Sequence, residues 1–246
     1  MVYLPSFLRD PIALILGEKC TETLIDRFDI LEPTCLRFAI SKALGIAIVA
    51  GGCIVKLPQI YKIISSKSAR GLSLASFLLE TMANFVNIAY SIRQNFPFTT
   101  FGESVFIGIQ NYFIAITIMI LNGQELLGMV AAGMLVVVAY LLNDSSWTSG
   151  NFLATLQALT IPLLISSRIP QILKIHKEKT TGQLSSFSVF NYFLGTLARI
   201  YTTFVEVDNN LVLVGYLLSL VTNGILATQM IYYWNSSPKS SKLKKH

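Results

Sequence analysis

The sequence predicts an all-α membrane protein whose seven transmembrane helices form two parallel triple-helix-bundle repeats joined by a linker helix, a 3+1+3 arrangement. Composition is the first reason. Of 246 residues, 53% are hydrophobic and only 13% are charged, and the mean hydropathy is +0.59. A soluble domain carries about 25% charged residues, so this chain lacks the polar side chains to cover a globular surface. Lipid must therefore cover much of it.

The second reason is a short phrase that occurs twice. It reads KLPQIYKI at 56–63 and RIPQILKI at 168–175, an offset of 112 residues. The same offset relates Asn111 to Asn223, so the register extends well beyond the phrase. A fixed offset sustained over this distance indicates an internal structural repeat.

In order, we expect a charged N-terminal lumenal segment, a first repeat, a linker helix, a second repeat and a basic cytosolic tail. The sequence places these parts at 1–35, 36–121, 122–147, 148–235 and 236–246. An apolar run of about 20 residues matches the hydrocarbon thickness of a bilayer. Runs of this kind predict spans at 43–61, 70–93, 101–121, 126–142, 152–173, 184–205 and 211–234.

The linker span determines the relation between the repeats. Three spans reverse the chain's side of the membrane and one more restores it, so both repeats enter in the same orientation. Parallel repeats predict a site between the halves near the bilayer midplane. Lysines and arginines follow predicted spans one and five and fill the tail, all on one side, whereas the opposite loops carry only Arg93. This predicts a cytosolic C-terminus and a lumenal N-terminus.

A polar stripe marks the second predicted span. Glu80, Asn84 and Asn87 are spaced i, i+4, i+7 and share one helix face. Ionisable groups near mid-bilayer are functional candidates because they are costly there. These side chains either line a polar, substrate-binding cavity or hold helices together. The second repeat has different residues at the equivalent positions, Tyr192, Thr196 and Arg199.

Two cations occupy equivalent positions in the repeated phrase. Lys56 and Arg168 each precede a basic residue at the cytosolic edge by six positions, which places them about 9 Å inside it. Either their long stems reach back to the interface, or they bind the phosphate of a lipid. The deeper Arg199 would serve the same anion or pair with Glu80.

The Pro-Gln pairs of the two phrases are candidate hinges. Pro58 and Pro170 interrupt helix hydrogen bonding, and each is followed by a glutamine, Gln59 and Gln171. Pro162 adds a second interruption to the fifth predicted span. Such positions are simple packing features or gating hinges.

Cysteines, histidines and candidate nucleophiles argue against several other classes. Cys20 and Cys35 fall in the predicted lumenal segment, where a disulfide bridge is an open hypothesis, and Cys53 lies in the first span. Three cysteines and two distant histidines provide no metal site. The sequence has no nucleophile–base pair and no basic face with interleaved aromatics. We therefore expect no enzyme, cofactor, metal or nucleic-acid partner.

Several stretches resemble the PQ-loop and SWEET superfamily, and within it the mannose-P-dolichol utilization defect 1 family. They are SKALG at 41–45, VKLPQ at 55–59, KSARGLSL at 67–74, NFPF at 95–98, TGQLS at 181–185, LARI at 197–200 and YWN at 233–235. The superfamily resemblance also implies that Asn111 and Asn223 match the asparagine pair lining the pocket of sugar-carrying relatives. Amides of this kind suit sugar hydroxyls, and the alternative is that both only pack.

The resemblance implies an endoplasmic-reticulum protein required for the use of dolichyl-phosphate mannose and dolichyl-phosphate glucose in lumenal glycosylation. These polyprenyl (dolichyl) phosphate sugars would be its ligands, which it reorients or presents within the membrane lipids, with glycosyltransferases as further partners. One alternative is a small-solute transporter of the sugar or proton-coupled amino-acid kind. Another is a non-transporting chaperone or binding module for glycosyltransferases.

The last residues predict a localisation signal. Lys242 and Lys244 stand near the end of the chain with the spacing of a dilysine retrieval signal, which a COPI-type coat reads in the cytosol. The alternative is a plain polybasic tail attracted to anionic headgroups, each lysine contributing about 1 kcal/mol.

Overall fold

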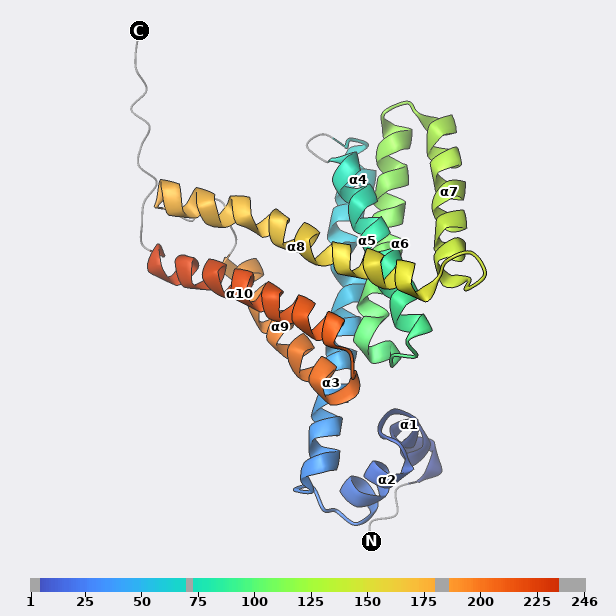
Figure 1. Ribbon diagram of the computed structural model, residues 1–246, viewed down its shortest axis with the longest axis vertical. Helices are drawn as coiled ribbons and strands as arrows, with labels where there is room; N and C mark the ends of the chain where they lie inside the picture. Colours follow the sequence, from blue (N-terminus) through green and yellow to red (C-terminus); the bar gives the residue numbers. More distant parts are fainter. Residues whose placement is uncertain (1–4, 70–72, 180–185, 235–246) are drawn as a thin grey trace. The chain divides into compact units, whose positions relative to one another are not determined.

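The computed structural model describes residues 5–69, 73–179 and 186–234, and all regular elements in these ranges are helices (Figure 1). The N-terminal segment holds three short helices, and eight further helices follow it. In chain order they are α1 Ser6–Leu16, α2 Glu18–Thr21, the π-helix η1 Glu22–Asp26, α3 Pro33–Ile54, α4 Leu57–Ser66, α5 Leu74–Arg93, α6 Phe98–Leu121, α7 Glu125–Asn143, α8 Gly150–Glu178, α9 Ser186–Glu206 and α10 Asn210–Tyr232.

The chain forms two compact units. The first comprises Met1–Gln157 together with Tyr201–Asp208, the end of α9, and the second comprises Ala158–Ile200 and Asn209–His246. Each unit has its own core, and each is described by itself below.

Among the described residues, five stretches of helix are long and apolar enough to cross a bilayer: Pro33–Ser66, Phe98–Leu121, Glu125–Asn143, Gly150–Glu178 and Asn210–Tyr232. The protein is therefore a multi-pass, all-α membrane protein. Helices α5 and α9 occupy the positions of the predicted second and sixth spans, but their polar residues keep them out of this set. The count of seven spans stays a prediction.

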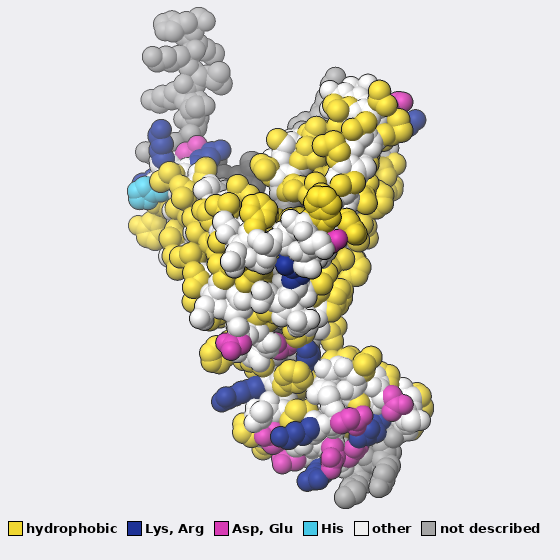
Figure 2. Space-filling view, turned by 45° about the vertical axis from the view of Figure 1, so that its right-hand side comes forward, with side chains coloured by type: hydrophobic (Ala, Val, Ile, Leu, Met, Phe, Trp, Pro, Cys, Tyr) yellow, Lys and Arg dark blue, Asp and Glu magenta, His cyan; other side chains and the backbone are white. Residues whose placement is uncertain are grey.

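Hydrophobic side chains cover much of the long helices, whereas charged side chains gather over the N-terminal segment (Figure 2). In that segment the sulfurs of Cys20 and Cys35 form a disulfide. The Arg9 guanidinium lies 3.1 Å from carboxylate oxygens of both Asp26 and Glu18. Hydrogen bonds to Asp26 and then Glu18 raise the pKa of Arg9 above its usual value. The disulfide and the Arg9 side chain, which bridges two carboxylates, thus hold together a segment that has little apolar core.

Helix α3 begins ten residues earlier than the predicted first span, at Pro33 rather than at 43. The reason is local. The Glu32 side chain accepts a hydrogen bond from the Cys35 backbone N–H at 2.5 Å, and Pro33 stands in the first turn, where its missing N–H costs nothing. The helix start therefore coincides with the disulfide.

Small residues bring α3 and α6 together in the first unit. A Cβ on Gly52 would lie 2.9 Å from the Glu103 Cα, and a Cβ on Gly45 would lie 2.9 Å from the Thr99 Cβ. Contacts this short leave no room for any side chain at the two glycines. Close approach between membrane helices commonly depends on small residues of this kind.

Two hydrophobic clusters of described residues correspond residue by residue. In the first unit, a cluster of buried residues joins α4, α5 and α6, and in the second unit another joins α8, α9 and α10. At an offset of 112, the first set, Ile63, Phe77, Ile114, Ala115 and Ile118, becomes the second set, Ile175, Val189, Leu226, Ala227 and Met230. The repeat found in the sequence is thus a repeat in packing.

Candidate functional site

The two Pro-Gln phrases have different backbones. In the first unit α3 ends at Ile54 and α4 starts at Leu57, so Pro58 stands in the first turn of a new helix. In the second unit Pro162 and Pro170 both lie inside α8, which continues through them. Gln59 and Gln171 directly follow Pro58 and Pro170. Of the predicted hinges, only Pro58 coincides with a break in the helix.

Gln110 on α6 closes the break between α3 and α4. Its Oε1 accepts a hydrogen bond from the Lys56 backbone N–H at 3.0 Å, and its Nε2 donates to the Gly52 carbonyl at 2.7 Å. In a continuous helix these two backbone groups would bond to each other. One side-chain amide therefore satisfies both ends of the missing bond, which matters in a membrane because water is absent.

In the same unit, Lys56 projects from the break toward α5. Its Nζ lies 3.3 Å from Glu80 Oε2 and 5.5 Å from the centre of the Phe77 ring. The side chains of Lys56 and Glu80 are 21% and 44% exposed. The structure thus joins two predicted residues as an accessible ion pair.

The second unit repeats this contact with different chemistry. The Arg168 guanidinium lies over the Tyr192 ring, 4.3 Å from its centre. Arg168 and Tyr192 are the repeat equivalents of Lys56 and Glu80. Each unit therefore holds the cation of its Pro-Gln phrase against the same position of the following long helix, once by an ion pair and once by a cation–π contact.

Asn84 and Asn87 of the first polar stripe satisfy local partners. The Asn84 side chain donates to the Glu80 carbonyl of its own helix at 2.7 Å. The Asn87 side chain donates to Ser104 Oγ at 2.8 Å and accepts from Gln157 Nε2 at 3.4 Å. Asn87 thus connects α5 to two other helices, as the packing interpretation requires.

The two predicted asparagines of α6 and α10 differ in bonding. Asn223 donates to Thr196 Oγ1 at 2.9 Å, so two predicted residues of the second unit meet. Asn111 is fully buried, and neither its amide nitrogen nor its amide oxygen has a hydrogen-bond partner among the described residues. A buried amide without partners is costly, which makes Asn111 a candidate to bind a polar ligand. The remaining stripe residue, Arg199, is also buried.

A buried ion pair lies where the sequence predicted no site. The Lys42 ammonium on α3 is 2.6 Å from Glu206 at the end of α9, and Glu206 also accepts from Ser41 at 2.5 Å and Thr99 at 3.2 Å. The side chains of Lys42 and Glu206 are only 10% and 1% exposed. A lysine directly before the first predicted span was the available signal, but nothing in sequence order connects it to a glutamate 164 residues away.

The remaining predictions concern Cys53, the two tail lysines and metal binding. Cys53 in α3 is a free cysteine. Lys242 and Lys244 lie outside the described residues, so the retrieval signal stays a prediction. Within the described ranges, histidine, cysteine and acidic side chains form no group that could hold a metal ion.

Comparison with known proteins identifies the family. The PQ loop repeat family matches residues 40–100 and 145–212, just over half of the chain and one segment in each repeat. The chain belongs to the PQ-loop repeat family. It is also 26% identical to human solute carrier family 66 member 3 over 196 residues, 76% of this chain and 90% of that protein. No solved structure matches. The repeated cations Lys56 and Arg168 are thus features of a PQ-loop protein related to solute carriers.

Proposed function

We propose that this PQ-loop protein binds polyprenyl-phosphate-linked sugars, of the dolichyl-phosphate mannose and glucose class, and reorients or presents them within the endoplasmic-reticulum membrane. The observation that carries the proposal is the repeated placement of a phrase cation, Lys56 in one unit and Arg168 in the other. Both are partly exposed, and both face a second functional group of the same unit. No bond is made or broken in this role, so the protein is not an enzyme.

The chemistry of these groups fits the two parts of such a ligand. An arginine fork and a lysine ammonium both suit a phosphate. Tyr192 is 54% exposed and offers an aromatic face beside Arg168, while Asn111 offers an unpaired donor and acceptor for sugar hydroxyls. The resemblance of SKALG, KSARGLSL and LARI to the mannose-P-dolichol utilization defect 1 family supports this lipid class.

Binding and movement of the lipid test the proposal together. Purified protein in liposomes is given short-chain dolichyl-phosphate mannose, and both its binding and its transbilayer movement are measured. The double variant Lys56→Gln with Arg168→Gln should bind about tenfold less lipid, the effect of losing a charge-assisted contact. Lys62→Gln, an exposed lysine of α4, is the matched control and should bind normally.

The two readouts separate the two forms of the proposal. Binding with movement identifies reorientation, and binding without movement identifies presentation. Wild-type binding by the double variant would refute the phosphate role of the two cations.

A small-solute transporter is the second candidate, because the related human protein is named a solute carrier. The partly exposed Glu80 carboxylate, the ion-pair partner of Lys56, would then be the group that carries the coupled proton. Uptake of a water-soluble sugar or amino acid driven by a pH gradient, and abolished by Glu80→Gln, would favour this function. The same liposomes would then show no binding of the dolichyl-linked sugar.

A further inference from the structure

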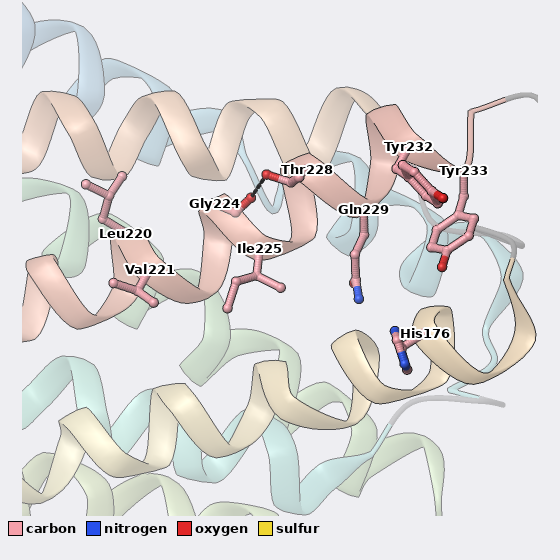
Figure 3. A pocket seen from close by; sticks show the side chains of 9 residues that line it. All are labelled: His176, Leu220, Val221, Gly224, Ile225, Thr228, Gln229, Tyr232 and Tyr233. Carbon is pink, nitrogen blue, oxygen red and sulfur yellow. Dashed lines mark hydrogen bonds between the residues drawn. The ribbon is translucent and has the colours of Figure 1, made fainter.

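A groove runs between α8 and α10 of the second unit, and none of the residues that line it is among the predicted site residues, although Asn223 is next to Gly224 in the sequence. Its volume is about 510 Å³, within the usual range for ligand pockets. It is lined by His176 on α8 and, from α10 and the residue after it, by Leu220, Val221, Gly224, Ile225, Thr228, Gln229, Tyr232 and Tyr233 (Figure 3). Ile225 and Gln229 point from α10 toward α8, and His176 points back toward them.

The lining changes character from one end of the groove to the other. Leu220, Val221 and Ile225 form an apolar end, and His176, Tyr232 and Tyr233 form a polar, aromatic end at the C-termini of both helices (Figure 3). Both helices are apolar enough to cross a bilayer. Amphipathic aromatic side chains favour the membrane–water interface. The two ends of the groove therefore match the two parts of a lipid in a membrane. The aliphatic end suits the hydrocarbon chain, and the polar end suits the headgroup.

Positive charge lies at the polar end. The ammonium of Lys179, the residue after the end of α8, sits 5.8 Å from the centre of the Tyr233 ring, and Lys177 is exposed on the last turn of α8. Gln229 donates to the Ile172 carbonyl at 3.2 Å, while its buried Oε1 has no hydrogen-bond partner in the described part of the chain. This end thus offers cations to an anion and one acceptor to a hydroxyl group.

From this arrangement we infer that the groove holds a single-chain lipid phosphate, with the chain beside Val221 and Ile225 and the phosphate at Lys179 and His176. A single groove between two helices favours one polyprenyl chain over the two chains of a phospholipid. The inference rests on the proposed function and adds a binding site for the lipid part of the ligand. The phosphate contacts at Lys179 and His176 are distinct from the phrase cations Lys56 and Arg168.

Photo-crosslinking locates the lipid directly. Full-length protein in nanodiscs is irradiated with a polyprenyl phosphate that carries a diazirine on the isoprenoid unit next to the phosphate, and labelled peptides are identified by mass spectrometry. We expect label within 172–179 and 224–233. Excess unlabelled polyprenyl phosphate should remove it, whereas two-chain phosphatidic acid or inorganic phosphate at the same concentration should not.

Paired variants test the two ends of the groove. Lys179→Glu places an anion at the headgroup end, and Ile225→Trp fills the apolar end. Each should reduce labelling about tenfold. Lys62→Glu alters another exposed lysine, and Leu217→Trp alters an α10 side chain outside the lining that is 43% exposed, against 41% for Ile225. Both controls should label normally.

The other outcomes separate this inference from the proposed function. Competable label that maps only outside the groove, and that is unchanged in Lys179→Glu and Ile225→Trp, overturns the groove and leaves the function standing. Equal competition by phosphatidic acid would refute the preference of the groove for a single-chain lipid. If no peptide is labelled competably, both the groove and the proposed ligand class fail.

Discussion

At the scale of single residues, Gln110 has the clearest structural consequence. Gln110→Leu keeps a similar volume but leaves the Lys56 N–H and the Gly52 carbonyl without their partner. Each buried, unsatisfied group costs about 1–3 kcal/mol, so the melting temperature in detergent should fall and the Lys56 amide should exchange hydrogen faster. Gln110→Glu keeps the acceptor and is the control for that amide. Unchanged exchange at Lys56 in the leucine variant would show that another group closes the break.

Glu32 makes stability at the start of α3 depend on pH. Its carboxylate accepts the Cys35 backbone N–H, and mainly for that reason its pKa lies below the usual 4.5. A lowered folded-state pKa means that the stabilisation is present above the unfolded-state value and is lost as pH falls through the folded-state value. Melting temperatures measured from about pH 6 to about pH 3 should therefore fall more steeply for the wild type than for Glu32→Gln. Parallel curves would contradict this role of Glu32.

At the scale of elements, the buried Lys42–Glu206 pair ties the last turn of α9 to α3. Removing one partner leaves a buried charge, so Glu206→Ala should destabilise the protein by about 3–5 kcal/mol. The double variant Lys42→Met with Glu206→Leu removes both charges and should recover much of that loss. Thermal unfolding of the single variants Lys42→Met and Glu206→Leu and of the double variant measures the coupling, and additive losses would mean that the pair contributes little.

Element boundaries also show what the sequence could not reveal. The phrase KLPQ and the phrase RIPQ predict the same interruption, yet only the first breaks its helix. Gly51 and Gly52 precede the first phrase, whereas Leu163 and Leu164 stand at the equivalent places. Glycine disfavours helix by about 1 kcal/mol relative to alanine, and leucine does not. The position of Gln110 opposite the break depends on tertiary packing, which no local pattern encodes.

The candidate site was predictable in part for a similar reason. Periodicity and the 112-residue offset were sufficient to select Lys56, Glu80, Arg168 and Tyr192, because repeats place equivalent positions in equivalent environments. They could not tell that Asn87 joins helices while Asn111 has no partner among the described residues. Both are asparagines on apolar helices, and only the neighbouring side chains distinguish them.

At the scale of the whole molecule, the distribution of cations predicts sidedness. A tag placed after His246 should be removed by protease added to sealed microsomes, because the basic loops and the tail are expected in the cytosol. Protection of the tag from the protease would mean that the topology is inverted.

Alkylation of the intact protein without reductant should modify only Cys53, since Cys20 and Cys35 are bridged and a bridge persists in an oxidising lumen. Modification of all three cysteines would mean that the bridge is absent.

The paired hydrophobic cores also bear on ancestry. Two clusters that match at five positions, from Ile63 and Ile175 to Ile118 and Met230, are what duplication of one ancestral gene segment would leave behind. An ancestor with a single segment would have carried one such core and one Pro-Gln phrase. Fusion freed the halves to diverge, so that one came to hold Glu80 and a broken helix and the other Tyr192 and an unbroken one.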